Sequence, residues 1–130
     1  MKILLDTHVF LWHITGDVKM PVSFRNAIVD PLNDVFLSSA SVWEVVIKHA
    51  LGKLPLPATP AEYLPRQREA HQIESLSINE STVTHLASLP PIHRDPFDRI
   101  LIAQSLQYGL TLASVDSFVR DYSVALLPVT

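Results

Sequence analysis

A run of three apolar residues ends at a carboxylate in the stretch Lys2-Ile3-Leu4-Leu5-Asp6-Thr7-His8. A short run that is apolar at every position indicates a strand buried on both faces, as in the centre of a parallel sheet. An acid directly after such a strand lies at its carboxyl end, where open α/β sheets form their ligand crevice. The stretch therefore predicts a central parallel strand that carries Asp6 into a functional site.

Short apolar runs and longer helical segments continue to alternate along the chain. We expect strands at residues 3–5, 35–37, 73–78, 110–113 and 124–127. We expect helices at residues 9–14, 21–30, 42–51, 61–71, 79–89, 96–108 and 116–122. Strands that alternate with helices form right-handed crossovers and a parallel sheet covered on both faces. The sequence therefore predicts one α/β domain over residues 1–130, a three-layer α/β/α sandwich with a central parallel sheet.

The composition excludes several classes of protein. A chain of 130 residues with 48% hydrophobic residues suits a single folded core, and the absence of cysteine excludes disulfides and thiolate zinc sites. A formal charge of -3 is not that of a protein that holds nucleic acid by bulk positive charge, although bound cations can reverse the local field. No apolar run approaches the ~18 residues of a membrane span, and no signal peptide is evident. We expect a cytoplasmic protein without a membrane partner.

Five acids occupy places where strands end or helices begin. Asp6 and Asp116 each follow an apolar strand, Glu44 lies early in the helix after the second strand, and Asp95 and Asp98 open the helix at 96–108. Each has a local explanation. Asp6, Asp95 and Asp116 suit helix N-caps, Asp98 suits the acid three residues after a cap, and Glu44 suits a surface pair with the lysine at i+4, worth roughly 0.3 kcal/mol.

The joint placement of these acids favours a metal site. The carboxyl ends of parallel strands meet at one edge of the sheet, so the acids are expected to converge there. Carboxylates held together repel one another and raise each other's pKa values unless cations neutralise them, and their oxygens suit Mg²⁺ or Mn²⁺. The predicted catalytic and metal-binding residues are Asp6, Glu44, Asp98 and Asp116. Asp95 is either a further ligand or a helix cap only.

Four segments resemble the motifs of a known family. They are Leu4-Leu5-Asp6-Thr7, Ser39-Ala40-Ser41-Val42-Trp43-Glu44, His93-Arg94-Asp95-Pro96-Phe97-Asp98-Arg99 and Leu112-Ala113-Ser114-Val115-Asp116. Together, and in this order, they are similar to the motifs of PIN-domain proteins, and most of all to those of VapC-type toxins of bacterial toxin–antitoxin pairs. The family usually has threonine where Ser114 stands, and serine keeps the hydroxyl.

The resemblance implies a fold, an activity and partners. The fold is the three-layer α/β/α sandwich, and the activity is a Mg²⁺- or Mn²⁺-dependent endoribonuclease that leaves 3′-hydroxyl and 5′-phosphate ends. The family's acidic positions map onto Asp6, Glu44, Asp98 and Asp116, with Asp6 as the central ligand of one or two metals, and Asp95 belongs to the subgroup's pattern. Such toxins act on RNA, are typically homodimers, and are neutralised by a cognate antitoxin whose tail blocks the acidic pocket.

Several residues near the motifs are assigned secondary roles. Lys48, Arg94 and Arg99 flank the acids and are candidates for binding RNA phosphates, with solvated surface charge as the alternative. His93 and two other histidines near the motifs, at positions 8 and 49, are expected to be structural, because the family pattern does not require them as ligands. The tryptophans at positions 12 and 43 have apolar neighbours and are expected in the core or at a dimer interface.

Three other functions stay open at this point. A phosphatase with an aspartate nucleophile normally needs a second aspartate two residues later, where this chain has His8. A structure-specific DNA nuclease shares the acidic arrangement, although a chain of this size has little room for a DNA-clamping insertion. A non-catalytic binding module, with its acids serving only as caps, predicts no binding of divalent metal.

Overall fold

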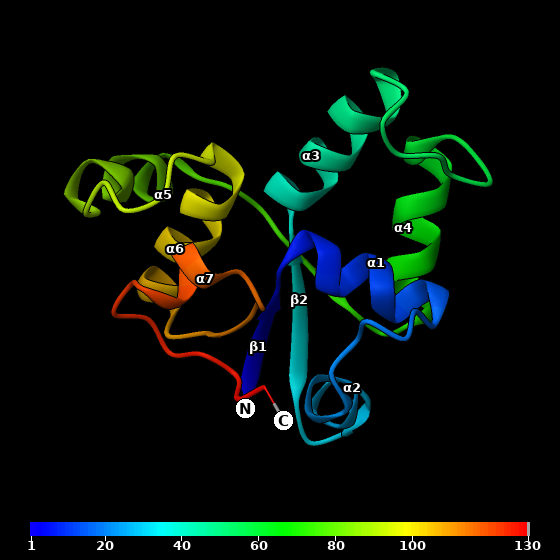
Figure 1. The fold of residues 1–130 in the computed structure, drawn as a ribbon, viewed down its shortest axis with the longest axis horizontal. Coiled ribbons are helices and arrows are strands. Elements are labelled where there is room, and N and C mark those ends of the chain that lie inside the picture. Colours follow the sequence, from blue (N-terminus) through cyan, green and yellow to red (C-terminus); the bar gives the residue numbers. More distant parts are fainter. Residues whose placement is uncertain (130) are drawn as a thin grey trace.

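The computed structural model describes residues 1–129 and builds them around one parallel sheet (Figure 1). In the order in which they pair, its strands are β3 (Glu74–Leu76), β2 (Asp34–Ser38), β1 (Lys2–Leu5) and β4 (Thr111–Ala113). All three pairings are parallel, and Leu4 lies beside Phe36 on one side and Leu112 on the other. The first strand therefore lies inside the sheet, as its apolar run predicts.

Helices cover both faces of this sheet. They are α1 (Thr7–Thr15), α2 (Val22–Val29), α3 (Ser39–Ala50), α4 (Pro60–Ala70), α5 (Glu80–His85), the 3₁₀ turn η1 (Leu86–Ser88), α6 (Pro96–Tyr108) and α7 (Ser117–Arg120). Figure 1 shows α1, α2 and α4 on one side of β1 and β2, α5, α6 and α7 on the other, and α3 above the end of β2. Within residues 1–129, no helix combines the length and the apolar character needed to cross a bilayer.

Two apolar clusters hold the layers together. Ile3 and Leu5 pack with α1, α2 and α4 in one cluster, whereas Leu4 between them packs with α6 and α7 in the other. Successive side chains of a strand point to opposite faces, so a strand that is apolar throughout contributes to both cores. The two cores confirm the predicted three-layer α/β/α architecture.

Local capping decides where the helices begin and end. Asp6 caps α1, and its Oδ1 accepts a hydrogen bond of 2.8 Å from the N–H of His8. Gly16 and Gly109 end α1 and α6 in the left-handed conformation, which glycine adopts without a steric penalty. Ser38 caps α3, so this helix begins at residue 39, three residues before the predicted start.

Some predicted boundaries are wrong. The strand expected at 124–127 is an isolated bridge between Leu112 and Leu126. The N–H of Leu112 donates to the carbonyl of Ala125 and that of Leu127 donates to the carbonyl of Leu112, but Pro128 has no N–H to continue the ladder. The helix expected at 79–89 divides into α5 and η1.

Candidate metal centre

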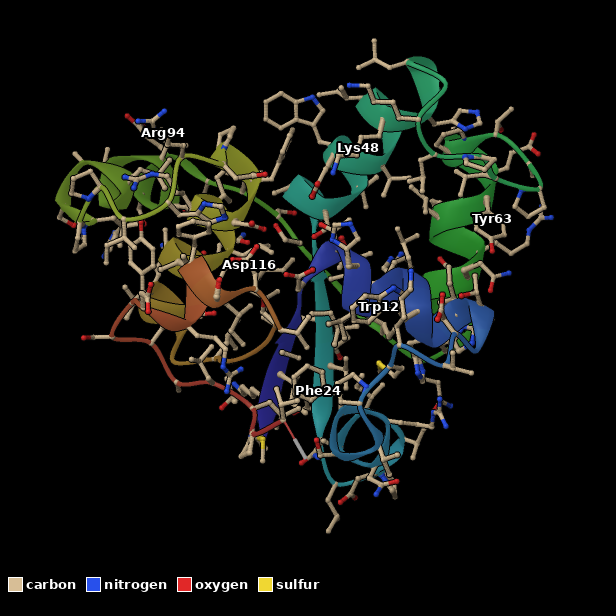
Figure 2. The ribbon with its side chains drawn as sticks, in the orientation of Figure 1. Trp12, Phe24, Lys48, Tyr63, Arg94 and Asp116 are labelled. Atoms are coloured by element: carbon tan, nitrogen blue, oxygen red, sulfur yellow. The ribbon has the colours of Figure 1, made fainter. Side chains whose placement is uncertain are left out.

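The predicted acids line one open cleft of about 300 Å³ at the carboxyl ends of the strands. Its lining residues are Asp6, His8, Trp12, Glu44, Lys48, His93, Asp95, Asp98, Val115 and Asp116. In the sheet, β1 lies between β2, which follows it in the chain, and β4, which comes last. Such a topological switch point is where open α/β sheets bind ligands. Figure 2 shows Lys48 on α3 and Asp116 before α7 on opposite sides of this region.

Asp6 lies directly after β1 and is held from two sides. Its Oδ1 accepts from the N–H of His8 at 2.8 Å, and its Oδ2 accepts from the hydroxyl of Ser114 at 2.8 Å. Burial raises the pKa of Asp6, and the hydrogen bond from Ser114 opposes that rise. The carboxylate is therefore fixed in orientation in a place that disfavours its negative charge.

Glu44 lies in the second turn of α3 and is 4% exposed. Its Oε2 accepts a hydrogen bond of 2.5 Å from the ammonium of Lys48, and this bond raises the pKa of Lys48. Its Oε1 is buried and has no hydrogen-bond partner among the residues that the structure describes. The Glu44–Lys48 pair is thus formed, but not on the surface, and it leaves one carboxylate oxygen with unmet bonding capacity.

Asp95 and Asp98 begin α6 with different roles. The Oδ1 of Asp95 accepts from the N–H groups of Phe97 and Asp98 at 2.8 and 3.1 Å, so Asp95 is a helix cap. The side chain of Asp98 points elsewhere, and its Oδ2 lies 2.7 Å from Nε2 of His93. Burial and the negative charge of Asp6 raise the pKa of Asp98 to about 7. The capping role of Asp95 is established, and its role as a ligand stays a prediction.

Asp116 and His93 complete the far side of the cleft. The Oδ1 of Asp116 caps α7 through the N–H of Phe118 at 2.8 Å, and its Oδ2 lies 3.9 Å from Nε2 of His93. One ligand atom from each of His93, Asp98 and Asp116 lies within 4.8 Å of the other two. Sequence reasoning gave His93 a structural role. Its position in the segment that carries Asp95 and Asp98 indicates a place near the site. The sequence does not reveal the loop conformation that brings its ring to Asp98.

The three basic residues predicted to bind RNA lie in different surroundings. Lys48 lines the cleft, whereas Arg94 is exposed at the outer edge of the molecule (Figure 2). The guanidinium of Arg99 donates to the carbonyls of Leu86 and Pro90, both at 3.1 Å, and to the hydroxyl of Tyr122 at 3.2 Å. Arg99 therefore fastens the segment before α6 in place of projecting into solvent.

The tryptophans also lie in different surroundings. Trp43 is 53% exposed and packs edge-on against Phe97 with ring centroids 5.0 Å apart, so the core position is wrong and a dimer interface stays a prediction. Trp12 is half-buried and lines the cleft beside His8.

Comparison with known proteins agrees with the fold. Ribonuclease VapC16 of Mycobacterium tuberculosis is 36% identical over 61 residues, which are 47% of this chain and 43% of that protein, so the match spans less than half of the relative. The VapBC2 structure from Rickettsia felis, bound to a DNA fragment from its promoter, superposes with a TM-score of 0.71 at 16% identity over 97% of both chains. FitAcB from Neisseria gonorrhoeae gives 0.60 at 25% identity over 97% of this chain and 96% of that one.

The family model described as PIN domain matches residues 3–124. This range includes β2, β3, β4, all of β1 after Lys2, and every acid of the cleft. The resemblance drawn from the four motifs is confirmed, and the chain belongs to the PIN domain family.

Proposed function

We propose that this chain is a Mg²⁺- or Mn²⁺-dependent endoribonuclease and the toxin of a type II toxin–antitoxin pair. The observation that carries the proposal is the buried oxygen Oε1 of Glu44, which has no hydrogen-bond partner within residues 1–129 and lies in a cleft lined by four further carboxylates. A site of this kind gains from a cation, since each buried unpaired carboxylate oxygen is costly. The ribonuclease name of the relative VapC16 supports RNA as the substrate.

The donor set of the cleft fits a hard divalent cation. The proposed ligands, direct or through water, are Asp6, Glu44, Asp98 and Asp116, with Asp95 as a further candidate. A bound ion of this kind supplies Lewis acidity, which lowers the pKa of water and stabilises a leaving oxygen. Burial, and to a smaller extent nearby negative charge, raises the pKa values of Asp6 and Asp98, and this supports a cation in the cleft.

The protein's own groups would position the substrate. Ser114 and the N–H of His8 hold the Asp6 carboxylate in one orientation. Lys48 is half-exposed in the cleft and is suited to pair with a phosphodiester oxygen. Arg94 lies further out, where it could contact the phosphates of an extended RNA. Arg99 is already engaged with carbonyl oxygens, so we now propose that it positions the site rather than binds RNA.

The test is Asp6→Asn, which removes the charge and keeps the shape. A metal centre supplies several kcal/mol to such a reaction, so cleavage of single-stranded RNA should fall by at least about 100-fold. EDTA should stop RNA cleavage by the parent protein, and added Mg²⁺ or Mn²⁺ should restore the cleavage. Asp34→Asn, at the opposite end of β2, is the matched control and should cleave at the parent rate. A folded Asp6→Asn variant that cleaves as fast as the parent would refute the assignment.

The toxin role and its partners form a separate part of the proposal. The VapBC2 and FitAcB structures and a complex from Klebsiella pneumoniae share this fold, and the last is titled a toxin-antitoxin complex. We expect expression of this chain to arrest bacterial growth, co-expression of a cognate antitoxin to relieve the arrest, and Asp6→Asn to be harmless. Sedimentation velocity should find a homodimer. Normal growth with fully active ribonuclease present would contradict the toxin role.

The competing functions differ in what they bind and cut. Hydrolysis of small phosphate esters without RNA cleavage would favour a phosphatase, and preference for flapped DNA over single-stranded RNA would favour a DNA nuclease. A calorimetric titration with Mn²⁺ that gives no binding would favour a non-catalytic module.

A further inference from the structure

The part of the cleft formed by His93, Asp98 and Asp116 places an imidazole nitrogen 2.7 Å from a carboxylate oxygen. We propose that Nε2 of His93 is a direct ligand of the metal centre, which gives this part of the cleft a mixed nitrogen and oxygen donor set that selects Mn²⁺ over Mg²⁺. The inference rests on the proposed metal-dependent function and specifies which ion it uses.

The geometry around Nε2 of His93 suits a shared ion. This atom lies 2.7 Å from Oδ2 of Asp98 and 3.9 Å from Oδ2 of Asp116, and the ligand atoms of the three residues all lie within 4.8 Å of one another. Ligands that bind one ion at about 2.1 Å lie up to about 4 Å apart. Small rotations of the side chains are therefore enough to bring the three donors onto one ion.

The imidazole is held in this orientation by contacts that do not involve the acids. Its ring stacks on Phe118 with centroids 5.2 Å apart and an interplanar angle of 18°. The backbone N–H of His93 donates to the hydroxyl of Tyr122 at 3.0 Å, and Arg99 donates to the backbone carbonyl of His93 at 3.4 Å. The side chain is 14% exposed. The stacking fixes the plane of the ring, and the two hydrogen bonds fix the backbone that carries it.

A second, independent observation indicates that a cation belongs in this cleft. Glu44 is only 4% exposed and lines the same cleft as His93. Its oxygen Oε1 has no hydrogen-bond partner in the described chain. The other nitrogens of the cleft are less suited to bind metal. The hydrogen bond to Glu44 raises the pKa of Lys48, so its amine stays protonated and cannot bind metal. The side chain of His8 is 62% exposed, and its Nδ1 lies 3.8 Å from Asp6.

The donor set decides which ion is preferred. Mg²⁺ strongly favours oxygen ligands and keeps much of its water. Mn²⁺ also suits oxygen ligands, but as a transition-metal ion it accepts a nitrogen donor more readily than Mg²⁺ does. A cleft built of carboxylates alone would discriminate weakly between Mg²⁺ and Mn²⁺. With His93 as a ligand, the intact protein should bind Mn²⁺ much more tightly than Mg²⁺. Removal of the imidazole should lower the ratio of the Mn²⁺ affinity to the Mg²⁺ affinity.

The experiment measures Mn²⁺ bound to the whole protein by pulsed electron paramagnetic resonance and by calorimetry in competition with Mg²⁺. The parent protein should show the ¹⁴N coupling of a directly bound imidazole. His93→Gln should lose that coupling, and the ratio of Mn²⁺ to Mg²⁺ affinity should fall by about tenfold or more. His93→Asp, which restores a charged oxygen donor, should recover Mg²⁺ binding without the nitrogen signal. His8→Gln is the matched control and should keep the signal.

The outcomes separate this inference from the proposed function. Mn²⁺ that binds the parent protein without ¹⁴N coupling, or with coupling that survives in a folded His93→Gln, overturns the role of His93 and leaves the nuclease proposal standing. Failure of the parent to bind Mn²⁺ at all overturns both. If His93→Gln does not fold, ¹⁴N coupling that persists in His8→Gln supports His93 as the ligand, and loss of the coupling in His8→Gln overturns the inference.

Discussion

The two halves of the cleft reach the same end of the sheet by different means. The inner half, Asp6 and Glu44, lies directly after β1 and within α3, and both residues are buried. The outer half, His93, Asp98 and Asp116, lies in a loop and at helix starts, and all three are partly exposed. The inner half is positioned by the strands and the outer half by loop contacts.

The two halves also differ in the groups that stabilise their carboxylates. In the inner half, the hydroxyl of Ser114 donates to Asp6, and the ammonium of Lys48, one turn along α3, donates to Glu44. In the outer half, the pKa of Asp98 rises to about 7 and its partner is an imidazole. On the proposals above, the inner half would fix the place of the metal and the outer half would set its selectivity.

The largest effect is expected when each half loses one carboxylate. Glu44→Gln should lower the rate of RNA cleavage by at least about 100-fold, because it removes a buried donor that no water can replace. Asp116→Asn should lower the rate by only about tenfold, because Asp116 is partly exposed and water can substitute for its oxygen. Single-turnover rates at saturating Mn²⁺ measure both losses. Equal losses would remove the distinction between the halves.

The support of the outer half is tested by Arg99→Gln. This change removes hydrogen bonds from a charged donor to Leu86, Pro90 and Tyr122, and should lower the free energy of unfolding by about 2 kcal/mol in urea. The neighbouring exposed residue offers the matched control, since Arg94→Gln should stay within about 0.5 kcal/mol of the parent. Equal stability of the two variants would contradict the anchoring role of Arg99.

A pH series without metal tests the charge of the outer half. Because the pKa of Asp98 is about 7 in the folded protein and lies at its ordinary low value in the unfolded chain, the folded state binds the extra proton between those values. The free energy of unfolding should therefore fall as pH rises through this range. Asp98→Asn should be more stable than the parent at about pH 8, by on the order of 1–2 kcal/mol.

The same series measured in chelator supplies its own control. Below the ordinary pKa of an aspartate, Asp98 is protonated in both the folded and the unfolded parent. The free energies of unfolding of the parent and Asp98→Asn should then agree most closely. Asp6 also has a raised pKa, so some pH dependence should remain in the variant. If the stability of the parent relative to Asp98→Asn does not fall between about pH 5 and about pH 8, burial does not dominate at Asp98.

The smallest effect concerns the hydroxyl that holds Asp6. Ser114→Ala removes a buried hydrogen bond and should lower the free energy of unfolding by about 1 kcal/mol. Ser117→Ala, on the exposed start of α7, is the comparison and should change stability by less than about 0.5 kcal/mol. If the two serine variants match in thermal unfolding, the hydroxyl of Ser114 is not needed to hold the inner half.

The inner half was the more predictable from sequence. An apolar strand followed by Asp6, and a second followed by a helix with Glu44, are local patterns whose meaning depends only on the parallel sheet. The cleft also contains Asp98 and Asp116, as those patterns predict.

The outer half and its supports were less predictable, because they depend on contacts between distant residues. The ring of His93 reaches Asp98 only because the loop is tied to Tyr122, 29 residues later in the chain. Arg99 looks like a surface charge in the sequence, yet its partners are carbonyls of the loop before it. The bridge at Leu126 was overestimated as a strand for the opposite reason, since its apolar pattern is local and its pairing is limited by Pro128.

The anchored guanidinium of Arg99 affects how a mutational scan of this protein should be interpreted. Replacing each basic residue in turn and scoring survival of the host would mark Arg99 as essential, although nothing in its bonding requires a nucleotide. If the chain is the ribonuclease proposed above, a map of RNA contacts drawn from such scores would include one false contact. Scoring the melting temperature of each variant beside its toxicity would separate the arginine that holds the loop from the residues that hold the substrate.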